Sequence, residues 1–102
     1  DPQLPMQCSE RKIMLPEKYE EKDSLVVPSY FIDTNHHMNN TRYVQVAMEY
    51  VPKEFRTMEV RVEYKKAAMC RDVIVPHVTI EDPRVTVALD GQLYAVVVFL
   101  KA

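Results

Sequence analysis

The hydrophobic pattern changes its period once along the 102-residue chain, at Pro52. Before this proline, apolar residues recur at three- and four-residue spacing, whereas after it they alternate with polar residues. A proline ends a helix because it lacks a backbone N–H and its ring clashes with the preceding turn. The chain is therefore predicted to hold one helix followed by a series of strands.

The predicted helix lies directly before Pro52. Its apolar face combines Val44, Met48 and Val51 with Tyr43, Ala47 and Tyr50, while Arg42, Gln45 and Glu49 share the opposite face. Asn39 or Asn40 is a suitable N-cap, because a short polar side chain can accept a hydrogen bond from an unpaired backbone N–H.

Four strands are predicted after the helix. In the first, Met58, Val60, Val62 and Tyr64 alternate with Glu59, Arg61, Glu63 and Lys65, which indicates one dry and one wet face. Val73–Ile80 follows, broken or bent at Pro76, and Val85, Val87 and Leu89 alternate in the third. Asp90-Gly91 is typical of a two-residue hairpin turn, since such a turn needs positive φ. Leu93–Leu100 is nearly all apolar, which predicts burial on both faces.

Residues 1–23 resemble a linker, because three prolines punctuate them and Glu17–Asp23 is dense in charge. Residues 24–102 are predicted to form a single domain. They begin with a short β-prone run, Leu25–Tyr30, and a polar loop. This order predicts an α+β hotdog fold, in which one central helix is wrapped by a curved antiparallel sheet of about five strands. The linker-like start and the absent initiator methionine suggest a piece of a longer protein.

Composition argues against several classes of protein. Thirteen Lys and Arg against fifteen Asp and Glu give a net charge of −2, without the basic surface that nucleic-acid binding needs. No apolar run approaches the roughly 18 residues of a membrane helix. Cys8 and Cys70 fit no metal or redox spacing, which favours a reducing, cytoplasmic setting, although one bond between them stays possible.

Polar residues are densest at 33–40, directly before the helix. Asp33, Asn35 and His37 alternate there, so an extended loop would place them on one side. A carboxylate, an amide and an imidazole together could orient and activate a water, and helix N–H groups could polarise a carbonyl. The alternative is that this Asx-rich segment only caps and turns the chain.

Three other interpretations are weaker. Adjacent His36 and His37 point in opposite directions in an extended loop, so a metal site with His77 is disfavoured and no metal is expected. Asn39-Asn40-Thr41 matches a glycosylation tripeptide, but no secretory signal accompanies it. Cys70 is disfavoured as a nucleophile, because a lone cysteine is more often an inert residue.

Residues 31–44 resemble the signature D-x-N-x-H-x-N-N-x-x-Y of fatty acyl–acyl carrier protein thioesterases, which opens the second of their two hotdog repeats. Residues 11–17 are similar to the linker between those repeats. Val62–Lys66 with Arg71-Asp72 is similar to the strand after the helix. The resemblance implies hydrolysis of the thioester between a fatty acyl chain and acyl carrier protein, without a cofactor.

Under this resemblance Asp33, Asn35 and His37 are the catalytic residues, and Asn39 and Asn40, at the helix start, bind substrate. The family's next catalytic residue is a Glu shortly after a Tyr of the following strand. The matching position here, after Tyr64, is Ala67, and Ala68 stands where plant members have a cysteine. Loss of a general base lowers the catalytic rate by on the order of a hundredfold or more.

Two alternatives therefore stay open beside an acyl carrier protein thioesterase. The chain could be a non-catalytic hotdog half-domain with a structural or acyl-binding role, or a related hotdog that acts on acyl–coenzyme A. A small domain buries little of its surface, so a partner is expected, either a second hotdog repeat or a second copy of the chain. Neither nucleic acid nor membrane is an expected partner.

Overall fold

The computed structural model describes residues 7–10, 15–32 and 37–101, with the side chains of 7–10 outside the description. Its elements in chain order are β1 (Gln7–Glu10), β2 (Glu20–Glu21), β3 (Leu25–Val26), a 3-10 turn (Ser29–Phe31), α1 (Asn40–Met48), β4 (Thr57–Tyr64), β5 (Val73–Glu81), β6 (Arg84–Asp90) and β7 (Ala95–Lys101). One helix followed by four long strands is the order that the change of period predicts.

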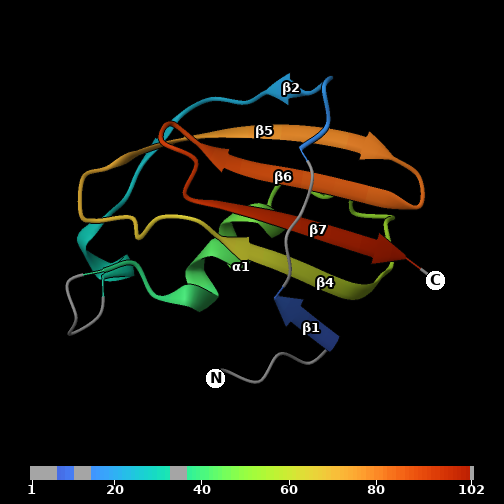
Figure 1. Ribbon diagram of the computed structural model, residues 1–102, viewed down its shortest axis with the longest axis horizontal. Coiled ribbons are helices and arrows are strands. Elements are labelled where there is room, and N and C mark those ends of the chain that lie inside the picture. The colour runs from blue at the N-terminus through green and yellow to red at the C-terminus, as the bar shows by residue number, and fades with distance from the viewer. Residues whose placement is uncertain (1–6, 11–14, 33–36, 102) are drawn as a thin grey trace.

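The described strands form one seven-stranded sheet in the order β1-β4-β7-β6-β5-β2, with β3 also paired to β5. The long strands β4 to β7 pair with one another in an antiparallel manner, as predicted, and α1 packs on β6 and β7 from one face (Figure 1). The expected number of about five strands was too low. Segment 1–23 adds β1, which runs parallel to β4, and β2, at the opposite edge.

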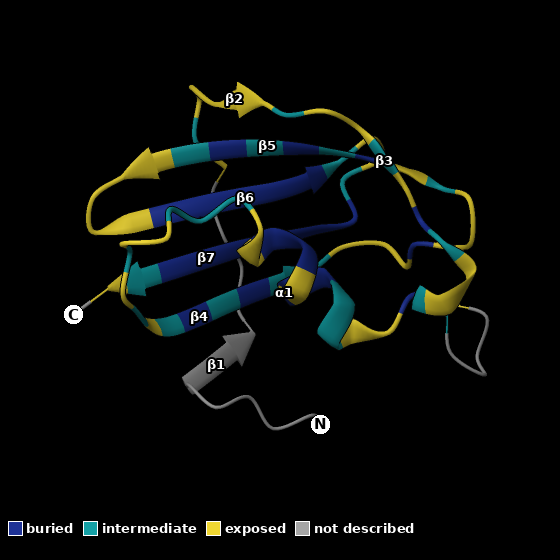
Figure 2. Cartoon of the chain, turned by 180° about the vertical axis from the view of Figure 1, so that it is seen from behind, coloured by how far each residue is buried: buried dark blue, intermediate teal, exposed yellow. Residues whose placement is uncertain are grey.

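The apolar core lies between α1 and the sheet, where Figure 2 shows the middles of β6 and β7 buried. From α1 the buried side chains are Tyr43, Val44, Val46 and Ala47. Met48 was expected on this face but is 48% exposed. The helix ends at Met48, before Pro52, because the backbone tightens: the N–H groups of residues 49–51 bond to carbonyls three positions back.

The strand was predicted to be broken or bent at Pro76, and the break is wrong. β5 runs through this proline, which lies opposite Leu89 of β6. The carbonyl of Pro76 accepts the N–H of Lys22, on the β2 side. Because the N and C=O of one strand residue face the same way, the donor that proline lacks would also point towards β2. The ladder to β6 therefore keeps all its hydrogen bonds.

The turn between β6 and β7 is longer than the predicted two-residue hairpin. Four residues, 91–94, separate the strands, and the N–H of Tyr94 bonds to the carbonyl of Leu89. Positive φ was expected at both Asp90 and Gly91; it is confirmed at Gly91 (+107°) but not at Asp90, and Leu93 is left-handed instead. The side chain of Asp90 accepts the N–H of Leu93 at 2.9 Å and so stabilises the wider turn.

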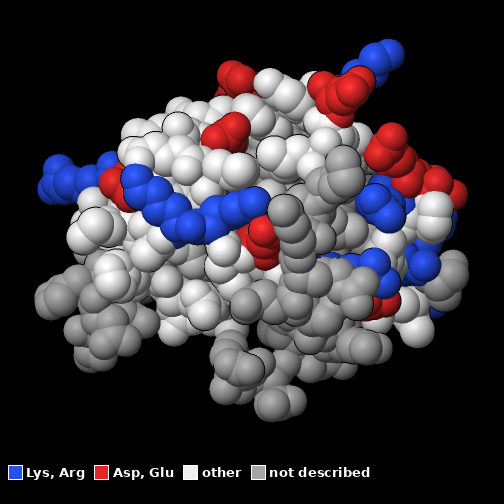
Figure 3. Space-filling model, viewed as in Figure 1, with Lys and Arg blue, Asp and Glu red and all other residues white. Residues whose placement is uncertain are grey.

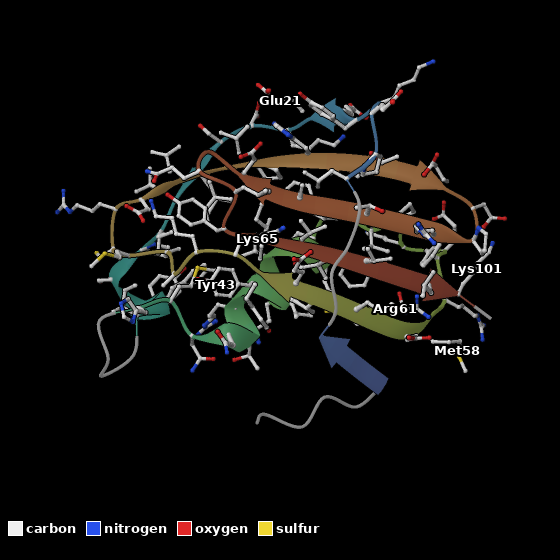
Figure 4. The ribbon with its side chains drawn as sticks, viewed as in Figure 1. Glu21, Tyr43, Met58, Arg61, Lys65 and Lys101 are labelled. Carbon is white, nitrogen blue, oxygen red and sulfur yellow. The ribbon has the colours of Figure 1, made fainter. Side chains whose placement is uncertain are left out.

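Burial on both faces of β7 is confirmed for Ala95 to Phe99. On the face away from α1, the side of β4 that was predicted to be exposed to solvent is only partly exposed. Arg61 pairs with Glu59 at 2.6 Å and Lys65 with Glu63 at 3.1 Å, and all four are half-buried or better at their side chains (Figure 4 labels both cations). Each charged group lies beside an opposite charge, and this pairing offsets part of the cost of removing the two charges from water.

Acidic and basic side chains are interspersed on the face seen in Figure 3. This distribution agrees with the balanced composition. In the described part of the chain, no helix has the length and apolar character needed to span a bilayer.

Candidate active site

A cavity of about 580 Å³ opens between the start of α1 and the chain that leaves β4. It is lined on the helix side by His37, Met38, Asn39, Asn40, Thr41 and Tyr43, and on the strand side by Tyr64, Lys65, Lys66 and Ala67. Three predicted site residues, His37, Asn39 and Asn40, therefore line one cavity. Asp33 and Asn35 lie outside the described residues, so their convergence with His37 stays a prediction.

The loop that carries the polar motif is closed at its base. Ile32 and Met38 form an isolated antiparallel bridge, and the N–H of Asn39 bonds to the carbonyl of Phe31 at 3.1 Å. The side chain of Met38 is buried in the core, whereas that of His37 is exposed. Alternation along an extended chain explains this, since burying Met38 turns its neighbour outwards, to the cavity.

Asn39 is the N-cap of α1, as predicted. Its side-chain oxygen accepts the N–H of Thr41 at 2.9 Å and also the Thr41 hydroxyl. Among the described residues, the backbone N–H of Asn40 has no hydrogen-bond partner. Asn40 lines the cavity at the N-terminus of α1, where the helix dipole favours negative charge.

The wall opposite His37 contains Ala67, the position where the resemblance leads us to expect a Glu. The segment is held by the carbonyl of Tyr94, which accepts the N–H groups of Lys65 and Lys66 at 2.8 and 3.0 Å. A carboxylate at position 67 would share the cavity with the imidazole. The assignment of that Glu to position 67 stays a prediction.

Two buried tyrosines, Tyr43 at the cavity and Tyr94 in the turn before β7, have a raised pKa. Burial raises the pKa of Tyr43, against a smaller opposing effect from its hydrogen bond to the backbone of Ala68. Burial also raises the pKa of Tyr94, and the nearby Asp72 carboxylate, to which it is hydrogen-bonded, acts in the same direction. Both phenols are therefore neutral hydrogen-bonding groups near pH 7.

Cys70 and His77 do not line the cavity. Cys70 is free and exposed in the turn after Ala68. His77 stacks on Tyr19, with 4.1 Å between ring centroids, and lies 3.4 Å from carboxylate oxygens of Glu21 and Asp90. The described residues contain no group of three or more side chains placed to hold a metal ion.

The sequence pattern did not indicate that two tyrosines line the cavity. Tyr43 and Tyr64 both line the cavity, in an edge-to-face pair with 5.5 Å between centroids. Tyr43 closes the quoted signature, and that was the available signal. The spacing of Tyr43 with the other apolar residues of the helix indicated only that its side chain would be buried, and it is buried.

The sequence of residues 15–90, about three quarters of the chain, matches the sequence model of the acyl-ACP thioesterase C-terminal domain family. Among curated proteins, no sequence matches significantly.

Solved structures with a similar fold include a Lactobacillus plantarum protein named as an oleoyl thioesterase (TM-score 0.65, 21% identity) and a Bacteroides thetaiotaomicron acyl-ACP thioesterase (TM-score 0.65, 18% identity). The match covers 97% and 98% of this chain but 42% and 44% of theirs, so the chain spans less than half their length. A third is Escherichia coli YbaW, named as a thioesterase (TM-score 0.56, 15% identity), with 78% of this chain and 77% of that one covered.

Proposed function

Because the chain belongs to the acyl-ACP thioesterase C-terminal domain family, we propose that it hydrolyses fatty acyl thioesters as one hotdog repeat of a two-repeat enzyme. The observation that carries the proposal is the cavity, which His37 lines together with Asn40, the first residue of α1. An imidazole able to accept a proton and a donor for the developing oxyanion are two groups that acyl transfer requires.

In the proposed reaction, a water attacks the thioester carbonyl and His37 accepts its proton. Asp33 and Asn35 orient the imidazole and the water, and the N–H of Asn40 stabilises the negative charge that forms on the carbonyl oxygen. The carbon–sulfur bond then breaks, and the proton passes to the leaving thiolate. The products are the fatty acid and the free thiol of the carrier.

Asn39 and Asn40 are proposed to bind the acyl carbonyl from the helix start, with acyl carrier protein as the preferred carrier and coenzyme A as the alternative. A cytoplasmic location is part of the same proposal. The second repeat, or a second copy of the chain, is proposed to complete the acyl pocket, because the structural relatives are more than twice as long.

The test compares the wild-type chain with His37→Ala on a long-chain acyl thioester of acyl carrier protein and on the same acyl group carried by coenzyme A. Released fatty acid is measured by mass spectrometry, because the exposed thiol of Cys70 would react with thiol reagents. We expect His37→Ala to lower the rate by about a hundredfold or more. His77→Ala is the matched control, since His77 lies outside the cavity. Equal rates for His37→Ala and wild type would disprove the role of His37.

The second candidate is a non-catalytic half-domain, and Ala67 is the observation that favours it. Its side chain lines the cavity wall but cannot accept a proton. Ala67→Glu separates the two candidates. A rise in rate of about a hundredfold would mean that the rest of the site is intact. If neither the wild-type chain nor Ala67→Glu hydrolyses the thioester, the result favours the non-catalytic role.

A further inference from the structure

The position of residue 67 in the cavity depends on its neighbour, Ala68. The side chain of Ala68 is fully buried, and both of its backbone polar groups are bonded across the site. Its carbonyl accepts the N–H of Met38 at 2.8 Å, and its N–H donates to the hydroxyl of Tyr43 at 2.8 Å. The segment that follows β4 is thus fastened both to the polar loop and to α1.

Tyr43 is the part of this attachment that a side chain supplies. It is 2% exposed and lies in the first turns of α1, where Figure 4 labels it. Its ring packs edge to face against Tyr64. A phenylalanine could fill the same space and keep the ring contact. Only the hydroxyl can accept the buried N–H of Ala68, which would otherwise lose its partner without reaching water.

We propose that Tyr43 is a positioning residue: through its bond to Ala68 it fixes the side chain of residue 67 in the cavity wall opposite His37. This proposal rests on the proposed function, since it concerns the geometry of that site. It also explains why a tyrosine lies on a helix face that otherwise needs only an apolar side chain. A carboxylate placed at position 67 would act together with the imidazole of His37 only while the hydroxyl of Tyr43 is present.

The experiment uses four chains: wild type, Ala67→Glu, Tyr43→Phe and the double variant. Nuclear magnetic resonance of His37 reports on position 67 whether or not the chain hydrolyses anything. We expect Ala67→Glu to shift the imidazole resonances of His37 when Tyr43 is present, and to shift them at least threefold less in Tyr43→Phe. Equal shifts in both backgrounds, or no shift in either, would overturn the proposal.

Amide exchange provides the second measurement. Tyr43→Phe should speed exchange at Ala68 by at least tenfold and leave helix amides such as Ala47 unchanged, which also shows that the variant folds. Tyr50→Phe removes a partly buried hydroxyl outside the cavity and should change neither site. If Tyr43→Phe folds poorly, the spectra are recorded in sucrose, which favours the compact state. Unchanged exchange at Ala68 in Tyr43→Phe would also overturn the proposal.

Hydrolysis separates this proposal from the proposed function. If Ala67→Glu raises kcat, the rise should be at least tenfold smaller in Tyr43→Phe, with KM unchanged, and undiminished in Tyr50→Phe. A loss of helix stability alone would not reduce the rise in kcat while leaving KM unchanged. If no chain hydrolyses thioesters but the His37 shifts depend on Tyr43, the proposed function fails and the positioning role stands.

Discussion

Asn39 is expected to contribute to stability independently of any contact with substrate. Its side-chain oxygen caps α1 through Thr41, so Asn39→Ala removes the acceptor of a helix N–H. The expected loss is about 1 kcal/mol of the free energy of unfolding, while Asn39→Asp should keep most of the stability. Urea denaturation measures it as a lower midpoint with an unchanged m-value.

The control for this experiment is Asn40→Ala, one position along. The side chain of Asn40 is exposed and makes no hydrogen bond recorded among the described residues, so its removal should cost only a few tenths of a kcal/mol. Equal losses in the two variants would mean that the cap bond does not stabilise α1.

Gly91 is expected to resist substitution because of both its backbone and its surroundings. Its φ of +107° lies beyond the region that side chains tolerate, and an added Cβ would lie 2.5 Å from the carbonyl oxygen of Val73. Gly91→Ala should therefore lower the free energy of unfolding by more than about 1 kcal/mol. Thermal unfolding checks this against Gln92→Ala, an exposed change in the same turn. A cost no greater than that of Gln92→Ala would contradict the strained geometry.

At the scale of elements, the packing of α1 against the turn before β7 predicts a sensitivity to alkaline pH. Tyr43 and Tyr94 are buried and have a raised pKa, and burial also raises the pKa of the partly buried Tyr50. The folded chain therefore holds phenol protons at these positions that the unfolded chain releases near pH 10. Stability from these groups is complete below pH 10 and is lost as pH rises through the folded pKa values. Each contributes at most about 1.4 kcal/mol per pH unit in that window.

Urea denaturation between pH 8 and pH 11 measures this slope. Removing both phenols, in Tyr43→Phe with Tyr94→Phe, should flatten the fall in the free energy of unfolding above pH 10. Tyr30→Phe is the control, since Tyr30 is exposed. A slope that is equally steep without Tyr43 and Tyr94 would show that other groups cause the loss.

The sequence predicted those elements whose signal is local. The spacing of apolar residues located α1 and the four long strands, because side-chain burial repeats with the period of the backbone. It could not predict that β5 continues through Pro76, since this depends on β2 lying on the side of the missing N–H. The strand β1 has no periodic pattern, and its backbone pairs with β4, some fifty positions away.

The candidate site divides in the same way. The polar motif and the helix start are adjacent in sequence, so His37, Asn39 and Asn40 could be placed together in advance. The attachment of Ala68 to Tyr43 joins residues 25 positions apart, and no spacing rule reaches that far. Only the resemblance to the thioesterase signature connected the strand side, through Ala67, with the loop side.

At the scale of the whole molecule, the N-terminal segment is attached to both edges of the sheet. β1 pairs with β4 at one edge, and at the other the hydroxyl of Thr79 donates to the carbonyl of Lys18 while Tyr19 stacks on His77. A segment joined at two edges is expected to stabilise the sheet. The boundary between a linker at 1–23 and a domain at 24–102 stays a prediction.

Removing residues 1–23 tests how far the remaining chain is a domain by itself. The truncated chain 24–102 loses the β1 and β2 ladders, and each net hydrogen bond contributes about 0.5–1.5 kcal/mol. We expect its free energy of unfolding to fall by about 2–4 kcal/mol in urea denaturation.

Dye binding is the second measurement. Four side chains that are buried in the 102-residue chain point away from α1, namely Thr86, Ala88, Val96 and Val98, so the truncated chain should also bind a hydrophobic dye. The 102-residue chain carrying Tyr19→Ala, which loses only the stack on His77, should show a smaller loss of stability and no dye binding. An unchanged midpoint for 24–102 would make segment 1–23 a linker alone.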